Sequence, residues 1–134
     1  MAQILLVDDD ELLRPMIRLV LERAGYRVRE ARNGNDAMRQ FAQDQGDLVI
    51  TDLIMPEKEG LALILEMRRI NRKLKIIAMS GGGRVSSKDY LEVAAKFGAA
   101  QVLNKPFSNQ ELLNAVHQVL EGGMAPVIPK SMIS

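Results

Sequence analysis

Three aspartates that follow short apolar runs are the most distinctive chemical feature of this 134-residue chain. Asp8 and Asp9 come directly after the run ILLV at 4–7, and Asp52 follows LVIT at 48–51. Such runs are typical of buried strands, and the ends of parallel strands share one edge of a sheet, where ligands bind. Three carboxylates at one edge repel each other by roughly 4 kcal/mol per pair at ~4 Å, with an effective dielectric of about 20. A cation must offset this repulsion, and hard oxygen ligands suit Mg²⁺, which also binds phosphoryl oxygens.

Two later strand ends bring further polar groups to the same edge. The run at 76–79 leads into Ser80, and the run at 102–104 leads into Lys105. A hydroxyl and an ammonium group therefore complete the constellation.

The chain alternates short apolar runs with amphipathic segments at a spacing of about 25 residues, which predicts βα units around a parallel sheet. The predicted strands are 3–7, 27–31, 47–51, 74–79 and 100–104. In the second strand Arg27 and Arg29 alternate with apolar residues, so we expect that strand at an edge of the sheet.

Five helices are expected between and after these strands. The first contains Pro15, which fits best close to a helix start, so this helix either begins late, near Leu12, or is slightly kinked. The last begins at Ser108, which forms an S-x-x-E capping box with Glu111, and ends before Gly122. The second predicted helix follows Asn33 and Gly34 and reaches about residue 43, the third follows the turn at 56–60 and ends near residue 71, and the fourth is 86–97.

Composition and charge narrow the range of functions. With 47% hydrophobic and 26% charged residues, the length fits one domain, expected over 1–121, and the Gly- and Pro-containing segment 122–134 is expected to be a mobile tail. A formal net charge of +1 provides no basic field for nucleic acid. The sequence contains no Cys, no signal-peptide core and no run long enough to span a membrane, so we expect a cytoplasmic protein without membrane contact.

Four motifs together resemble the receiver domain of two-component response regulators, in the stand-alone form found in chemotaxis. They are ILLVDDD, DLVITDLIMP, IIAMSGGG and VLNKPF, in the family's order and at family-like spacing. The resemblance implies a flavodoxin-like, doubly wound α/β fold with five parallel strands in the order 2-1-3-4-5 and five helices.

The resemblance also assigns roles to the residues at the predicted edge. It implies that Asp52 accepts a phosphoryl group, and that Mg²⁺ is held by Asp8, Asp9, Asp52 and the backbone carbonyl of Ile54. Lys105 would pair with Asp52 and then with a phosphoryl oxygen. In the family the bond between this lysine and the following proline is commonly cis, although either isomer of Lys105-Pro106 is compatible with the sequence.

The family's switch residues are matched only in part. Ser80 corresponds to the hydroxyl residue that moves toward the phosphoryl group. Val102 stands where the family usually has Tyr or Phe, and a small β-branched side chain cannot rotate inward as an aromatic ring does.

The sequence favours a single-domain response regulator that takes its phosphoryl group from a phosphohistidine of a sensor histidine kinase or histidine phosphotransfer protein. The output would be altered binding of a protein target to the face formed by the helix at 86–97, the strand at 100–104 and the last helix. We expect such a protein to catalyse its own Mg²⁺-dependent phosphorylation and its dephosphorylation, but not to be a turnover enzyme. The alternative is an interaction module of the same fold that signals without phosphorylation, which Val102 motivates.

Two enzyme or cofactor classes fit less well. Hydrolases with an aspartate nucleophile typically carry a second acid two residues later, where this chain has Ile54. In a flavin-binding relative the acidic run 8–11 would repel the phosphate that the same loop wraps.

Overall fold

The computed structural model describes residues 2–53, 60–80 and 98–121. Its centre is one sheet of five parallel strands in the order β2-β1-β3-β4-β5. The strands are β1 (Gln3–Val7), β2 (Arg27–Ala31), β3 (Leu48–Asp52), β4 (Ile76–Ser80) and β5 (Gln101–Asn104). This order confirms the predicted doubly wound topology, and β2 lies at an edge as expected.

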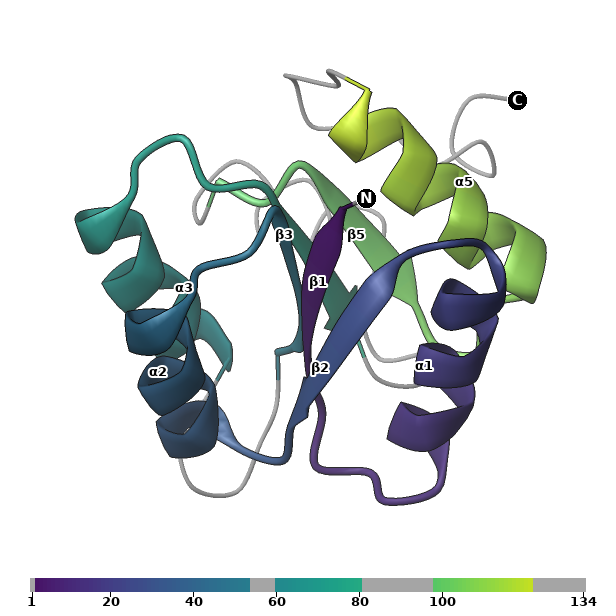
Figure 1. Cartoon of the computed structure of the whole chain (residues 1–134), viewed down its shortest axis with the longest axis horizontal. Coiled ribbons are helices and arrows are strands. Elements are labelled where there is room, and N and C mark those ends of the chain that lie inside the picture. The colour runs from purple at the N-terminus through teal and green to yellow at the C-terminus, as the bar shows by residue number, and fades with distance from the viewer. Residues whose placement is uncertain (1, 54–59, 81–97, 122–134) are drawn as a thin grey trace.

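Helices cover both faces of this sheet (Figure 1). On one face lie α1 (Leu13–Arg23) and α5 (Asn109–Leu120), and on the other α2 (Gly34–Gln43) and α3 (Gly60–Ile70). The helix predicted at 86–97 and the tail predicted at 122–134 lie outside the described residues. The four helices that are described begin or end within one or two residues of their predicted bounds.

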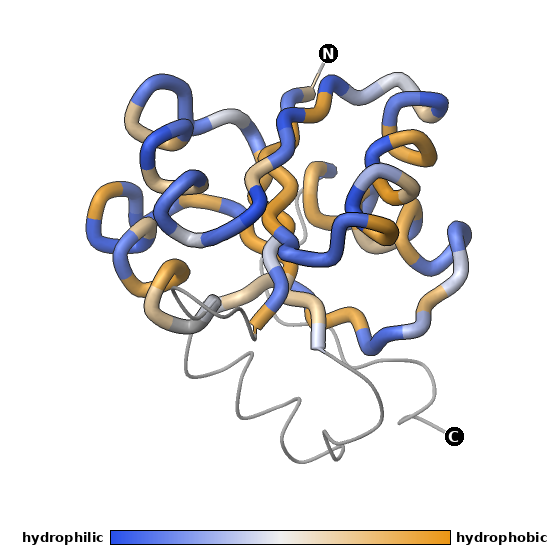
Figure 2. The backbone as a smooth tube through the Cα atoms, turned by 90° about the horizontal axis from the view of Figure 1, so that it is seen from below, coloured by the Kyte–Doolittle hydropathy of each residue, from blue (hydrophilic) through white to orange (hydrophobic). Residues whose placement is uncertain are grey.

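The two faces of the sheet form two hydrophobic cores, because successive side chains of a strand point to opposite faces. In β1, Leu5 and Val7 belong to the core under α2 and α3, whereas Ile4 and Leu6 belong to the core under α1 and α5. Every residue of β3 and β4 is buried, which explains why their sequences are apolar without alternation. In Figure 2 the apolar segments accordingly converge on the middle of the molecule.

Side-chain caps fix where two of the helices begin. The Asn33 side chain accepts a hydrogen bond from the Asp36 backbone N–H at the start of α2. At the start of α5, Ser108 and Glu111 form the predicted capping box. Pro15 lies within the first turn of α1, where a missing N–H costs no helix hydrogen bond.

The predicted bounds of three strands were wrong by one or two residues. β3 and β4 continue through Asp52 and Ser80 instead of ending before them, and β5 begins at Gln101. The reason is pairing between neighbours, which sequence patterns do not reveal: Asp52 is in register with Met79, and Ser80 with Asn104. Asp52 and Ser80 are therefore held by the sheet itself.

Within the described residues, no helix combines the length and the apolar character needed to cross a bilayer.

Candidate functional site

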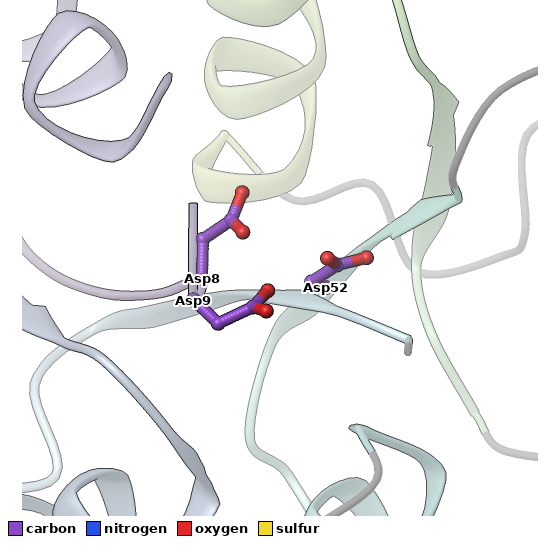
Figure 3. Close-up of side chains that lie close together, drawn as sticks. All are labelled: Asp8, Asp9 and Asp52. Atoms are coloured by element: carbon purple, nitrogen blue, oxygen red, sulfur yellow. The ribbon is translucent and has the colours of Figure 1, made fainter. Parts of the chain in front are cut away.

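The carboxylates of Asp8, Asp9 and Asp52 meet at the carboxyl edge of the sheet (Figure 3). One oxygen from each lies within 4.8 Å of the other two. Asp8 follows β1 and is fully buried, Asp52 ends β3 and is 7% exposed, and Asp9 is exposed. Because β1 pairs directly with β3, residues 44 positions apart in the chain lie side by side. The sequence prediction that these three acids lie together is confirmed.

Lys105 places a positive charge between two of these acids. Its Nζ lies 2.9 Å from Oδ2 of Asp8 and 3.3 Å from Oδ2 of Asp52. Burial lowers the pKa of Lys105, but the hydrogen bond to Asp8 and the charges of Asp52 and Asp8 outweigh burial, so that its pKa is raised. Lys105 is therefore a firmly held cation that offsets part of the repulsion among the acids.

Ser80 and Lys105 reach the edge on neighbouring strands. Ser80 is the buried last residue of β4, and its carbonyl accepts a hydrogen bond of 2.8 Å from the backbone N–H of Lys105. The Lys105-Pro106 peptide bond, for which the sequence allowed either isomer, is cis.

The backbone around Asp52 is closely packed. The Thr51 hydroxyl donates to the Asp52 carbonyl over 3.0 Å, and the Gly60 N–H donates to the Leu53 carbonyl over 3.0 Å. A Cβ on Gly60 would lie 1.9 Å from the Asp52 carbonyl oxygen, which is far inside van der Waals contact. The start of α3 can approach the phosphoacceptor candidate this closely because Gly60 has no side chain.

Asp8 is held on both sides of its own carboxylate. Its Oδ1 accepts the Asp10 backbone N–H at 3.0 Å, and its Oδ2 accepts from Lys105. Its backbone carbonyl accepts a hydrogen bond of 2.8 Å from Nη1 of Arg14. The buried carboxylate thus has a defined orientation.

Asp10 and Glu11 lie in the loop just before helix α1, and within the described residues they contribute no ligand to the acidic cluster. Asp10 Oδ1 accepts the backbone N–H groups of Leu12 and Leu13 at 2.9 Å, and these two bonds lower its pKa. Glu11 pairs with Arg14 at 2.7 Å.

Val102 is half-buried on β5 and packs against the core under α2 and α3. The usual aromatic residue of the family is thus replaced by a small, half-buried side chain that packs against the core. Ile54, whose carbonyl was expected to serve the metal, lies outside the described residues.

Sequence reasoning missed four residues that support the site. A glycine at a helix start could have indicated the close approach of Gly60 to Asp52. Arg14 occupies a position on the buried stripe of α1 together with Ile17 and Leu21, so a charge at an apolar position was the available signal. Thr51 and Glu30 offered no such signal, because their roles depend on tertiary contacts.

The comparison with protein families agrees with this geometry. The model of the family described as "Response regulator receiver domain" matches residues 4–117, which include every site residue named above.

Individual relatives differ in how much of their length the chain covers. It is 38% identical over 125 residues to the DNA-binding transcriptional regulator NtrC of Azospirillum brasilense, covering 93% of this chain and 25% of the relative. The chain therefore spans about a quarter of that protein. It is 34% identical over 119 residues to the chemotaxis protein CheY of Bacillus subtilis, covering 88% of this chain and 97% of the relative.

Solved structures show the same likeness. A response regulator receiver domain protein from Clostridium thermocellum superposes with a TM-score of 0.82 at 29% identity, over 90% of this chain and 95% of the other. From the match to the family model, the strand order and the clustered acids, we conclude that this chain belongs to the response regulator receiver domain family.

Proposed function

We propose that this receiver domain accepts a phosphoryl group on Asp52 in a Mg²⁺-dependent reaction and thereby changes its affinity for a protein partner. The observation that carries the proposal is the cluster itself: oxygens of Asp8, Asp9 and Asp52 within 4.8 Å of one another, with the Lys105 ammonium beside two of them.

The donor set fits Mg²⁺. All three side chains offer hard carboxylate oxygens, and the exposure of Asp9 leaves access for the waters that Mg²⁺ retains. Asp8, Asp9 and Asp52 would hold the ion, together with the Ile54 carbonyl. When bound, the ion supplies positive charge against the phosphoryl oxygens and the acids.

The transfer step is a displacement at phosphorus. A carboxylate oxygen of Asp52 forms a P–O bond while the P–N bond of a phosphohistidine breaks. The electron pair of that bond remains on the imidazole, which departs neutral when its other nitrogen carries a proton. The product is an acyl phosphate on Asp52, so the domain catalyses a reaction upon itself and does not turn over a substrate.

Lys105 and Ser80 assist this step by stabilising negative charge. The Lys105 ammonium is already within 3.3 Å of Asp52 and can follow the charge as it moves to the phosphoryl oxygens. The Ser80 hydroxyl can donate to another phosphoryl oxygen from the end of β4. Its movement toward the phosphoryl group is the switch event in this proposal.

The phosphoryl donor in this proposal is a histidine on a sensor kinase or phosphotransfer protein. The sensor kinase CckA of Brucella abortus has a segment similar to this chain itself, 35% identical over 122 residues, which is 13% of its length. We place the output surface on β5, α5 and the segment 86–97, and its partner is a protein rather than nucleic acid. The receiver unit in this proposal is 1–121, with 122–134 as a tail.

Val102 favours a second candidate, an interaction module that binds its partner without phosphorylation. A phosphoryl group can shift the populations of two conformations of the domain only if it interacts more favourably with one of them. Because Val102 packs against the core and has no ring to rotate, the usual coupling of the phosphorylation site to β5 is altered in this candidate.

Incubation with acetyl phosphate, followed by intact-mass measurement, separates the two candidates. The proposal predicts one added phosphoryl group in the presence of Mg²⁺, loss of that species with a chelator, and no such species in Asp52→Asn. An unmodified wild-type mass under all conditions would favour the phosphorylation-independent module.

A further inference from the structure

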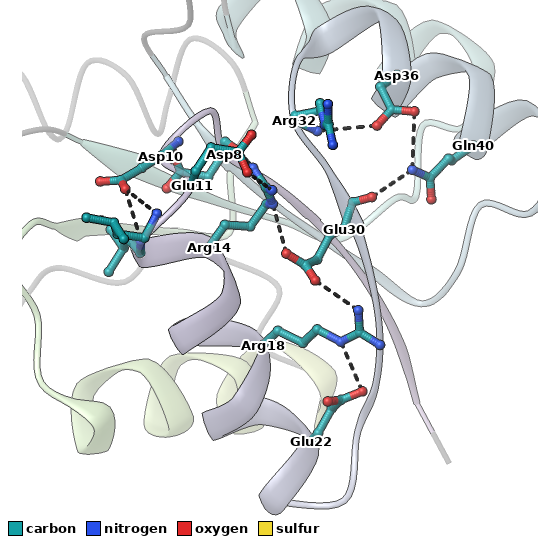
Figure 4. Close-up of polar contacts among 12 residues, drawn as sticks. Asp8, Asp10, Glu11, Arg14, Arg18, Glu22, Glu30, Arg32, Asp36 and Gln40 are labelled. Atoms are coloured by element: carbon teal, nitrogen blue, oxygen red, sulfur yellow. Dashed lines mark hydrogen bonds and ion pairs between the residues drawn. The ribbon is translucent and has the colours of Figure 1, made fainter.

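Arg14 is a buried cation behind the acidic cluster. It lies at the second position of α1 and is only 6% exposed, although its charge is costly to bury without partners. Three donors of its guanidinium are used: Nη1 bonds the Asp8 carbonyl at 2.8 Å, Nε bonds Glu30 at 2.8 Å and Nη2 bonds Glu11 at 2.7 Å (Figure 4). Arg14 therefore joins the acidic loop to strand β2.

The carbonyl that Arg14 holds belongs to the peptide between Asp8 and Asp9. Pairing of β1 with both neighbours ends at Val7 and continues only as one bond from the Asp8 N–H to the Ala31 carbonyl. The carbonyl of the same residue, Asp8, accepts its hydrogen bond from the Arg14 side chain. The orientation of this peptide determines where both carboxylates point, since one precedes it and the other follows it.

Glu30 is the more rigid of the two carboxylates that anchor Arg14. Glu11 is 62% exposed, and exposed ion pairs contribute little. Glu30 lies on β2, and its two oxygens pair with Arg14 and Arg18, each at 2.8 Å. Its backbone carbonyl also accepts a hydrogen bond of 2.7 Å from Gln40 of α2. Arg14 is thus fixed to the sheet at one end of its guanidinium and to the Asp8 carbonyl at the other.

We propose that Arg14 is a positioning residue, which holds the Asp8–Asp9 peptide in the orientation that directs both carboxylates toward Asp52. The inference rests on the proposed function, because its consequence is the affinity of the cluster for Mg²⁺. Groups that orient metal ligands typically change metal affinity by roughly 10-fold to 100-fold when removed.

Simple electrostatics predicts the opposite sign. Removing a cation near the cluster should strengthen Mg²⁺ binding by Coulomb's law. A loss of affinity in Arg14→Met, which keeps an apolar stem of similar length, therefore reports geometry and not charge.

The test measures Mg²⁺ binding to the metal-free protein by calorimetry. We expect Arg14→Met to bind Mg²⁺ roughly 10-fold more weakly or worse. Arg14→Lys keeps the charge but not the planar guanidinium, so its affinity for Mg²⁺ should lie between those of Arg14→Met and wild type. This variant remains informative if Arg14→Met does not fold. Arg18→Met is the matched control, because Arg18 pairs with the same Glu30 but not with Asp8, and it should bind like wild type.

Hydrogen exchange gives a second readout that needs no metal. The Asp10 amide is bonded to the Asp8 carboxylate, so its exchange should accelerate in Arg14→Met and remain unchanged in Arg18→Met. Equal or tighter Mg²⁺ binding by both Arg14 variants, with wild type still phosphorylated on Asp52, would overturn the positioning role alone. Failure of wild type to bind Mg²⁺ would overturn the proposed function and this inference together.

Discussion

Lys105 makes its shorter ion pair with Asp8 and its longer one with Asp52, at 2.9 Å and 3.3 Å. The lysine therefore bridges the buried acid and the phosphoacceptor candidate, because it pairs with one carboxylate oxygen of each. In the proposed Mg²⁺ site, the same ammonium would stabilise the clustered acids and compete with the ion for Asp8.

Replacing Lys105 by Met should move metal binding and phosphorylation in opposite directions. Without the competing ammonium, Mg²⁺ should bind several-fold more tightly, whereas phosphorylation by acetyl phosphate should slow by roughly 100-fold because a donor to the phosphoryl oxygens is lost. Calorimetry and a mass-based time course measure the two effects. Lys73→Met, at an exposed lysine outside the site, should change neither, and weaker Mg²⁺ binding in Lys105→Met would contradict the competition.

Gly60→Ala should disturb Asp52 through the backbone. The added Cβ would lie 1.9 Å from the Asp52 carbonyl, so β3 or α3 must shift, at a cost of about 1 to 3 kcal/mol in the free energy of unfolding. Phosphorylation should also slow. Urea unfolding gives the first quantity, with Leu65→Ala at an exposed position of the same helix as the control. A Gly60→Ala protein with the stability and the phosphorylation rate of wild type would show that the close approach of residue 60 to the Asp52 carbonyl is not required.

Glu30 should contribute stability that disappears in acid. Burial raises its pKa, but pairing with Arg18 and Arg14 outweighs burial and lowers the pKa below 4.5. A carboxyl group whose folded-state pKa is lowered stabilises the protein fully above its unfolded-state pKa, and this stabilisation is lost as the pH falls through the folded-state value.

The difference in the free energy of unfolding between wild type and Glu30→Gln should therefore be largest near neutral pH and shrink below about pH 4.5. Urea unfolding across that range measures it. Glu22→Gln, which removes an exposed carboxylate paired with the same Arg18, corrects for net charge. A difference that stays constant with pH would argue against the ion pairs.

Asp9 and Asp10 are adjacent acids with different predicted roles. Asp9→Ala should weaken Mg²⁺ binding by about tenfold or more, because a ligand is removed from the cluster. Asp10→Ala should lower the melting temperature, because the N–H groups of Leu12 and Leu13 at the start of α1 lose their acceptor, while Mg²⁺ binding changes little. Each variant serves as the charge-matched control for the other. The same loss of Mg²⁺ affinity in both would indicate a nonspecific effect of charge.

The sequence alone predicted the sheet and the polar groups at its edge, because both depend on short-range patterns. The apolar runs of β1 and β3 indicated strands buried on both faces. The site residues each stand at a strand end: Asp8, Asp9, Asp52, Ser80 and Lys105. The capping box of Ser108 and Glu111 likewise lies within four residues of sequence.

Features that depend on pairing between distant segments were not predictable. The extension of β3 through Asp52 follows from its register with Met79 on β4, 27 residues later. The ion pair of Arg14 with Glu30 joins a helix to an edge strand, and the contact of Gly60 with Asp52 requires knowledge of where α3 begins. Residues that only hold the site residues in place can therefore be recognised only indirectly from a single sequence.

A magnesium titration followed by two-dimensional NMR tests the central claim most directly, since it asks whether the three acids act as one metal site. The amide signals of Asp8, Asp9 and Asp52 should shift together along one single-site binding curve, and in Asp9→Ala the same shifts should need a much higher Mg²⁺ concentration. Signals of these three residues that stay unchanged through the titration would contradict the claim that the edge of this sheet binds a divalent cation.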